Sequence, residues 1–121
     1  AATDALAARL QAAGLAPPDL AELVPTPAAR RALERLIKAG LAVRTFDQVQ
    51  KRELVFHRDA IAEARTGLAP HLAPPGLTVG EAGAALGMTR KFSVPLLEYL
   101  DTVRFTRRLG DRRVLGPGPR D

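Results

Sequence analysis

The residues with the greatest potential for chemistry lie between Thr89 and Arg113. This stretch of 25 residues holds seven cations against three acids. The cations are Arg90, Lys91, Arg104, Arg107, Arg108, Arg112 and Arg113. Basic side chains neutralise phosphate, and arginine can also pair with it through two parallel hydrogen bonds. The pattern predicts a binding surface for a phosphate-bearing polyanion.

Three neighbours of these cations add other kinds of contact. The hydroxyl groups of Thr89 and Ser93 can hydrogen-bond to a ligand, and the ring of Phe92 can stack on an unpaired base. If a helix begins just after Thr89, its free backbone N–H groups would also point towards a phosphate. We therefore include these three residues with the seven cations as the candidate set for binding a nucleic acid.

The net positive charge of the whole chain is concentrated in its C-terminal part, where these residues lie. The 121 residues carry 18 basic and 13 acidic side chains, a net charge of +5, and 15 of the cations are arginine. Residues 1–88 hold 10 basic and 9 acidic groups, whereas residues 89–121 hold 8 and 4. An excess concentrated at one end favours a polyanionic partner over a uniformly basic surface.

The composition also excludes several function classes. The absence of cysteine removes disulfides, thiolate metal sites and cysteine nucleophiles, and two histidines are too few for a His-rich metal site. Ser93 has no histidine near it, and neither GxxxxGK[ST] nor GxGxxG occurs. No apolar run approaches the roughly 20 residues of a membrane span. We expect neither enzymatic activity nor a metal, a cofactor or a membrane partner.

The first part of the chain is predicted to be helical and then to form a hairpin. Apolar spacing and capping residues indicate helices over Thr3–Ala13, Leu20–Val24 and Pro27 to about Ala39. After Gly40 the apolar period changes to two, which indicates two strands within residues 41–57 joined by a turn near Asp47. Helix, helix, helix and hairpin is the order of a winged helix.

The same order then repeats. A connecting helix is predicted from Asp59 to about Leu72; because Gly67 and Pro70 weaken its second half, an end near Thr66 is the alternative. A helix over residues 79–86, a helix from Thr89 to Asp101 and strands within 103–109 and 112–115 follow. Leu-Glu-Arg-Leu at 33–36 matches Leu-Glu-Tyr-Leu at 97–100.

These observations predict a fold that is mainly α with small β-hairpins, in two tandem winged-helix domains. The expected division is a first winged helix at 1–57, a connecting helix and turn at 58–76, and a second winged helix at 77–121. The connecting helix may equally be counted with the second domain.

Pro95 conflicts with a regular helix after Thr89. It would be the sixth residue of that helix and would remove one internal hydrogen bond. We expect either a kink at Pro95, or a separate turn over residues 89–92 followed by a main helix that Ser93 caps.

The second copy resembles a known family. Residues 78–81 (TVGE), 86–101 (LGMTRKFSVPLLEYLD) and 106–115 (TRRLGDRRVL) are similar to the last winged-helix domain of the bacterial selenocysteine-specific elongation factor SelB. Residues 56–61 (FHRDAI) resemble the link before that domain. Thr89 and Phe92 stand where the family usually has Ser and Tyr. The first copy resembles the family only in its order of elements.

The resemblance implies a function that composition alone does not give. The full protein would be a translational GTPase that delivers selenocysteinyl-tRNA, and this chain would bind an mRNA hairpin, the selenocysteine insertion element. It would tether the factor beside a UGA codon, as a cytoplasmic monomer, with the ribosome as a further partner. Sequence would be read at unpaired bases, because side chains do not enter the narrow major groove of A-form RNA.

Two other functions are compatible with the residues. A DNA-binding winged-helix regulator would use the same cations in a major groove, usually as a dimer. A protein-interaction scaffold would place the basic face against an acidic partner.

Overall fold

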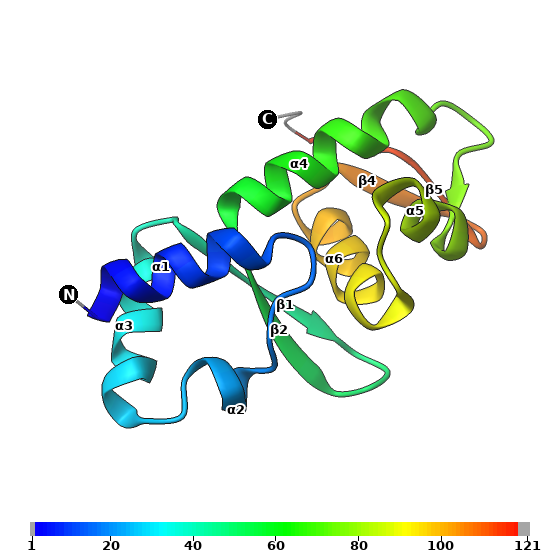
Figure 1. The fold of residues 1–121 in the computed structure, drawn as a ribbon. Helices are drawn as coiled ribbons and strands as arrows, with labels where there is room; N and C mark the ends of the chain where they lie inside the picture. The colour runs from blue at the N-terminus through cyan, green and yellow to red at the C-terminus, as the bar shows by residue number, and fades with distance from the viewer. Residues whose placement is uncertain (1, 119–121) are drawn as a thin grey trace.

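The computed structural model describes residues 2–118, which form helices with two small antiparallel sheets (Figure 1). The helices are α1 (Ala2–Ala13), α2 (Leu20–Leu23), α3 (Pro27–Lys38), α4 (Arg58–Leu68), α5 (Val79–Leu86) and α6 (Arg90–Thr102), with a 3₁₀ turn at Ala69–His71. The strands are β1 (Ala42–Asp47), β2 (Arg52–His57), β3 (Leu77–Thr78), β4 (Thr106–Leu109) and β5 (Arg112–Leu115). This composition agrees with the winged-helix class predicted from the sequence.

The helices of the first half, residues 2–57, begin and end where the sequence predicts. Thr26 caps α3 by accepting a hydrogen bond from the backbone N–H of Ala29 at 3.1 Å, and Pro27 occupies the first turn. The two long helices, α1 and α3, pack against each other. Their apolar faces form the first core, which consists of Leu6, Leu10, Leu23, Val24, Ala32, Leu33, Leu36, Ala42 and Val55.

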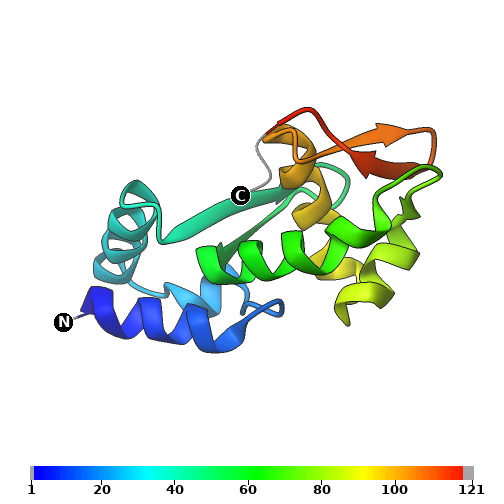
Figure 2. The same cartoon turned by 90° about the horizontal axis from the view of Figure 1, so that it is seen from above.

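The β1–β2 hairpin lies between this core and the second half, residues 58–118. Val55 belongs to the first core, whereas its neighbours Leu54 and Phe56 are buried in the second. Successive side chains of a strand point to opposite faces, so β2 is buried on both sides. β1 also contacts α6, and the hairpin reaches across to that helix (Figure 2). The hairpin is therefore packed between the two halves rather than free in solvent.

The connecting helix α4 ends at Leu68, between the two expected endings near Thr66 and Leu72. A side chain at Gly67 would lie 2.7 Å from the Leu86 Cδ2 atom, so the glycine allows α5 to pack closely on α4. Pro70 falls in the first turn of the 3₁₀ segment, where its missing N–H is not needed.

The second core surrounds α6. It consists of Leu54, Phe56, Ala60, Ile61, Ala64, Leu68, Leu72, Ala82, Leu96, Leu97, Leu100 and Phe105. A three-stranded sheet in the order β3-β5-β4 covers the end of this helix. The strands of its hairpin pair from Thr106 with Leu115 to Leu109 with Arg112.

Helix α6 is continuous, which corrects the alternative of a separate turn over residues 89–92. The backbone N–H groups of Phe92 and Ser93 both donate to the Thr89 carbonyl at 3.0 Å, so the helix begins at Arg90 and includes Pro95. Ser93 does not cap a second helix. Its side chain is 1% exposed and faces the interior.

The start of α5 gives a stability prediction. Thr78 Oγ1 accepts from the Glu81 N–H at 3.2 Å, and Glu81 Oε1 accepts from the Thr78 N–H at 2.9 Å. We expect Thr78→Ala to lower the free energy of unfolding by about 1 kcal/mol, measured by urea denaturation. Thr89→Ala is the matched control, because Thr89 caps α6 without a side-chain hydrogen bond. Equal losses in the two variants would contradict the assignment.

Candidate nucleic-acid interface

The beginning of α6 is the structural centre of the candidate interface. Gly87 ends α5 in the left-handed conformation, with φ 67°, and Thr89 is extended, so the chain turns sharply into the new helix. Thr89, Arg90 and Lys91 are all exposed there. The Thr89 hydroxyl makes no hydrogen bond within residues 2–118 and is available to a ligand.

A groove of about 440 Å³ lies between the start of α6, the β4–β5 hairpin and the turn of the first hairpin. Arg90, Lys91 and Arg108 line it, so the structure brings together predicted cations from the helix and the second hairpin. Arg90 and Arg108 form no ion pair with any described residue. Lys91 Nζ lies 3.2 Å from Asp19 Oδ1 and 5.4 Å from the centre of the Phe92 ring.

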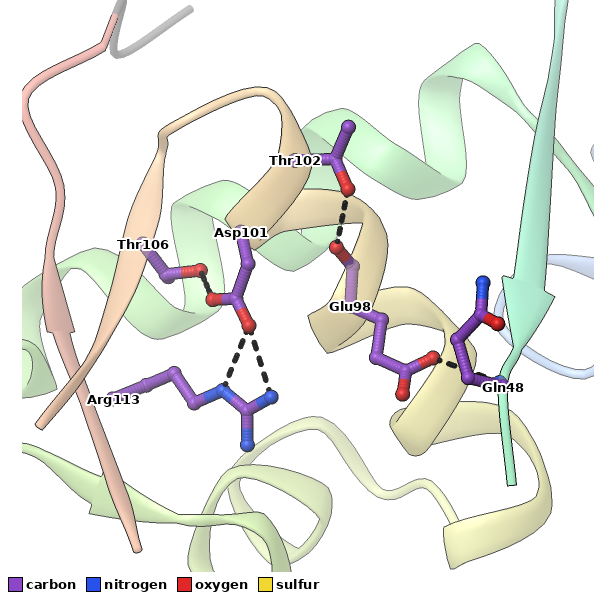
Figure 3. Close-up of polar contacts among 6 residues, drawn as sticks. All are labelled: Gln48, Glu98, Asp101, Thr102, Thr106 and Arg113. Atoms are coloured by element: carbon purple, nitrogen blue, oxygen red, sulfur yellow. Dashed lines mark hydrogen bonds and ion pairs between the residues drawn. The ribbon is translucent and has the colours of Figure 1, made fainter. Parts of the chain in front are cut away.

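The two acids of this groove are already engaged by backbone groups. Asp47 Oδ1 accepts from the N–H groups of Val49 and Gln50 at 2.9 and 3.0 Å. Glu98 Oε2 accepts from the Gln48 N–H at 3.2 Å (Figure 3). These hydrogen bonds hold the carboxylates to the hairpin turn, so the groove offers unpaired cations to an anion.

Arg104 and Arg107 lie elsewhere. They are exposed and line a second hollow of about 350 Å³, which also touches Arg108. Arg104 adopts a positive φ of 68° in the turn after α6. Arg108 is therefore the predicted cation that lies at both hollows.

Arg113 is the most buried of the predicted cations. It is 5% exposed, and its Nε and Nη2 atoms donate to Asp101 Oδ2 at 3.3 and 2.9 Å (Figure 3). Asp101 Oδ1 also accepts from the Thr106 hydroxyl at 2.7 Å. The guanidinium fills a structural ion pair between α6 and the sheet, because a buried cation needs a carboxylate partner.

Arg112 is half-buried and also has partners. Its Nη1 atom donates to Glu81 Oε1 at 3.1 Å and to the Gly76 carbonyl at 3.3 Å. The Thr78 backbone N–H, together with Arg112, lowers the pKa of Glu81 below its ordinary value. Arg112 thus ties the start of α5 to β5.

Phe92 and Ser93 are less accessible than Thr89, Arg90 and Lys91. Phe92 is half-buried and packs against the second core. The Ser93 Oγ atom is buried and has no hydrogen-bond partner in the described part of the chain. Helical periodicity explains this result, since Ser93 lies on the same face as the buried Leu97 and Leu100.

Sequence reasoning missed the contribution of the first hairpin. Arg52 and the turn residues Val49 and Gln50 line the same groove as Arg90. No periodic pattern in the sequence predicts this contact, because it depends on how the hairpin packs against α6. The available signal was Pro95, whose missing N–H leaves a carbonyl that another group must satisfy.

Two other cations of the first half, Arg9 and Arg44, are paired with acids. Arg44 donates to Glu34 and, at 2.8 Å, to Glu53, and the hydrogen bond to Glu34 is the main cause that raises the pKa of Arg44. Among residues 2–118 no group of three histidines, cysteines or acids is arranged for a metal ion. No described helix is long and apolar enough to cross a bilayer.

Residues 72–115 match the family of the winged helix of elongation factor SelB. The resemblance to the SelB winged-helix region is confirmed. The SelB match spans α5, α6 and the β4–β5 hairpin, and it includes all ten candidate residues. No curated protein sequence matches the chain.

Two solved structures have the same fold. A bacterial selenocysteine-specific elongation factor, EF-Sec, superposes with a TM-score of 0.78 and 24% identity over 94% of this chain. The mRNA-binding domain of SelB from E. coli, determined in complex with SECIS RNA, gives a TM-score of 0.70 and 21% identity over 95% of this chain and 97% of its own. The chain spans 18% of the length of EF-Sec.

Proposed function

We propose that this chain binds an mRNA hairpin, the selenocysteine insertion element, as part of a selenocysteine-specific elongation factor. The observation that carries the proposal is the groove lined by Arg90, Lys91 and Arg108 within the SelB-type winged helix. The likeness of nearly the whole chain to a SelB domain in complex with SECIS RNA supports the same ligand.

The exposed cations suit the phosphates of such a hairpin. Arg90 and Lys91 lie in the first turn of α6, where free backbone N–H groups add to their attraction for an anion. Arg108 would hold a second phosphate from the opposite wall of the groove. Thr89 and the half-buried Phe92 lie beside this region and would contact bases that leave the stem. Arg104 and Arg107 would extend the basic surface, and Arg112 and Arg113 would support it from within.

The whole chain is best interpreted as two tandem winged helices. The order α1-α2-α3 with β1–β2 recurs as α4-α5-α6 with β4–β5, which supports winged helices at 1–57 and 77–121, with the connecting helix in 58–76 counted with the second. Because β2 contributes to both cores, the two would pack as one body.

The larger protein would be a GTPase that acts in the cytoplasm beside the ribosome, with this chain as its non-catalytic, monomeric arm. Holding the factor on the message would raise its effective concentration at the codon to be recoded.

A titration with three ligands tests the proposal. The ligands are a bulged RNA hairpin from a selenoprotein message, the same stem without its unpaired bases, and duplex DNA of equal length. We expect tight binding to the first alone, with a slope of log K against log salt of about −3, as for three or four phosphate contacts. Equal binding to all three would instead indicate a basic surface without specificity, and preference for the duplex DNA would indicate a DNA regulator.

A further inference from the structure

Helix α6 contains a backbone carbonyl that lacks its regular helical donor. In a regular helix the N–H of residue 95 would donate to the carbonyl of Lys91, but residue 95 is proline and has no N–H. The Lys91 oxygen instead accepts a hydrogen bond from Nη2 of Arg52 at 3.3 Å. Arg52 lies 39 residues earlier in the chain, at the start of β2.

The hairpin delivers Arg52 in a fixed position. Arg52 pairs with Asp47 at the turn end of the β1–β2 ladder, and the Asp47 carboxylate holds the intervening turn by accepting from the N–H groups of Val49 and Gln50. The guanidinium is therefore presented by a turn with little freedom to move away from α6.

Arg52 is unusual among the cations of this chain. It is half-buried, its Nε atom is buried without a hydrogen-bond partner, and it forms no ion pair with residues 2–118. Burial of an unsatisfied N–H is unfavourable. Because Arg52 has no acidic partner among these residues, charge neutralisation does not explain why the side chain lies here either. The contact at its tip, with the Lys91 carbonyl, does.

Lys91 and its neighbour Arg90 are the cations that line the groove from α6. Two further contacts hold the same helix to the first half, the ion pair of Lys91 with Asp19 and the hydrogen bond from Gln48 to Glu98. Of these contacts, the Arg52 hydrogen bond fixes the backbone itself at the residue whose side chain enters the groove.

We propose that Arg52 is a positioning residue for RNA binding: by satisfying the Lys91 carbonyl that Pro95 leaves free, it orients the first turn of α6 and its cations towards the ligand. This inference rests on the proposed function. It also assigns a role to the first half of the chain, which supports the RNA-binding helix through its hairpin.

Two simpler roles for Arg52 make different predictions. Arg52 lines the groove, so it could contact the RNA directly. Alternatively, it could contribute only to stability. A double-mutant cycle between Arg52 and Pro95 separates these roles, because an alanine at position 95 restores the N–H that can satisfy Lys91.

The experiment uses the full chain with Arg52→Met, Pro95→Ala and the double variant, each titrated with the bulged hairpin and unfolded thermally. We expect Arg52→Met to weaken hairpin binding roughly fivefold in the wild-type background and less than twofold in the Pro95→Ala background. Arg31→Met, an exposed residue of α3, controls for the loss of one positive charge and should have little effect on affinity.

Every other result overturns the proposal. Equal losses of affinity in both backgrounds would mean that Arg52 contacts the RNA. Unchanged affinity in both, with a lower melting temperature, would mean that its role is only structural. If Pro95→Ala does not fold, the Lys91 carbonyl carbon is followed by NMR in Arg52→Met; loss of affinity without a shift of that resonance also overturns it.

The same experiment distinguishes a failure of the proposed function from a failure of the positioning role. If the wild-type chain does not bind the hairpin, the function is wrong, yet the coupling between Arg52 and Pro95 in thermal unfolding still reports whether the hydrogen bond exists. An absence of coupling there removes the positioning role whatever the chain binds.

Discussion

Replacement of Arg108 by glutamate is expected to weaken hairpin binding by roughly 10- to 100-fold at moderate salt. Arg108 is exposed, lies at both basic hollows and has no ion-pair partner in the part of the chain that the structure describes. The substitution removes an attraction for phosphate and introduces a repulsion in its place. The slope of log K against log salt should become shallower by about 1.

The melting temperature distinguishes this effect from unfolding. Because no group of residues 2–118 forms an ion pair or a hydrogen bond with the Arg108 guanidinium, Arg108→Glu should melt within a few degrees of the wild type. Arg31→Glu on α3 is the matched control, since it reverses one exposed charge on the first half. Equal weakening by both substitutions would show that net charge, and not the groove, attracts the RNA.

A companion substitution tells the two hollows apart. Arg107 neighbours Arg108 on β4 but lines only the second hollow of the two. If the RNA occupies the groove at α6, Arg107→Glu should reduce affinity less than Arg108→Glu does. The reverse order would move the RNA to the surface formed with Arg104.

Local signals in the sequence predicted the elements of this fold well. The N-cap at Thr26, the capping box at Thr78 and Glu81, and the glycine at the end of α5 all act within a few residues of themselves. Their geometry is fixed by the backbone groups that they satisfy, so sequence alone locates the helices to within a few residues.

The packing of the first hairpin could not be predicted in this way. Alternation suggested one buried face for β2, yet Leu54, Val55 and Phe56 are all buried because cores lie on both sides. A period of two reports that a strand exists, but a strand covered on both faces reads as a continuous apolar run. The contact of Arg52 with Lys91 follows from this packing.

The candidate site likewise has features that the sequence predicts and features that depend on packing. Composition pointed to the basic stretch, but it treated every cation as available. Arg112 and Arg113 have acidic partners, and these partners, Glu81 and Asp101, lie 31 and 12 residues away along the chain. Which cations are free depends on the sheet register that places each arginine, and charge counts do not contain that register.

The ion pair of Asp101 with Arg113 gives the largest expected effect on stability. We expect Asp101→Ala to lower the free energy of unfolding by about 3 kcal/mol. The substitution leaves the Arg113 guanidinium, whose side chain is 6% exposed, without a carboxylate, and it also removes the acceptor of the Thr106 hydroxyl. Since small domains are stable by about 5–15 kcal/mol, urea denaturation would show a clearly lower midpoint.

The reverse substitution should be milder, and this asymmetry tests the argument. Arg113→Met removes the buried charge together with its desolvation and leaves Asp101, at 22% exposure, with partial access to water and with Thr106 as a donor. We therefore expect it to destabilise the chain less than Asp101→Ala, because an unpaired charge is worse when it is buried more deeply. Asp111→Ala, exposed in the β4–β5 turn, controls for the loss of a carboxylate. If Asp101→Ala and Asp111→Ala unfold at the same urea concentration, Arg113 does not depend on Asp101, and its guanidinium becomes available to the RNA as the sequence first suggested.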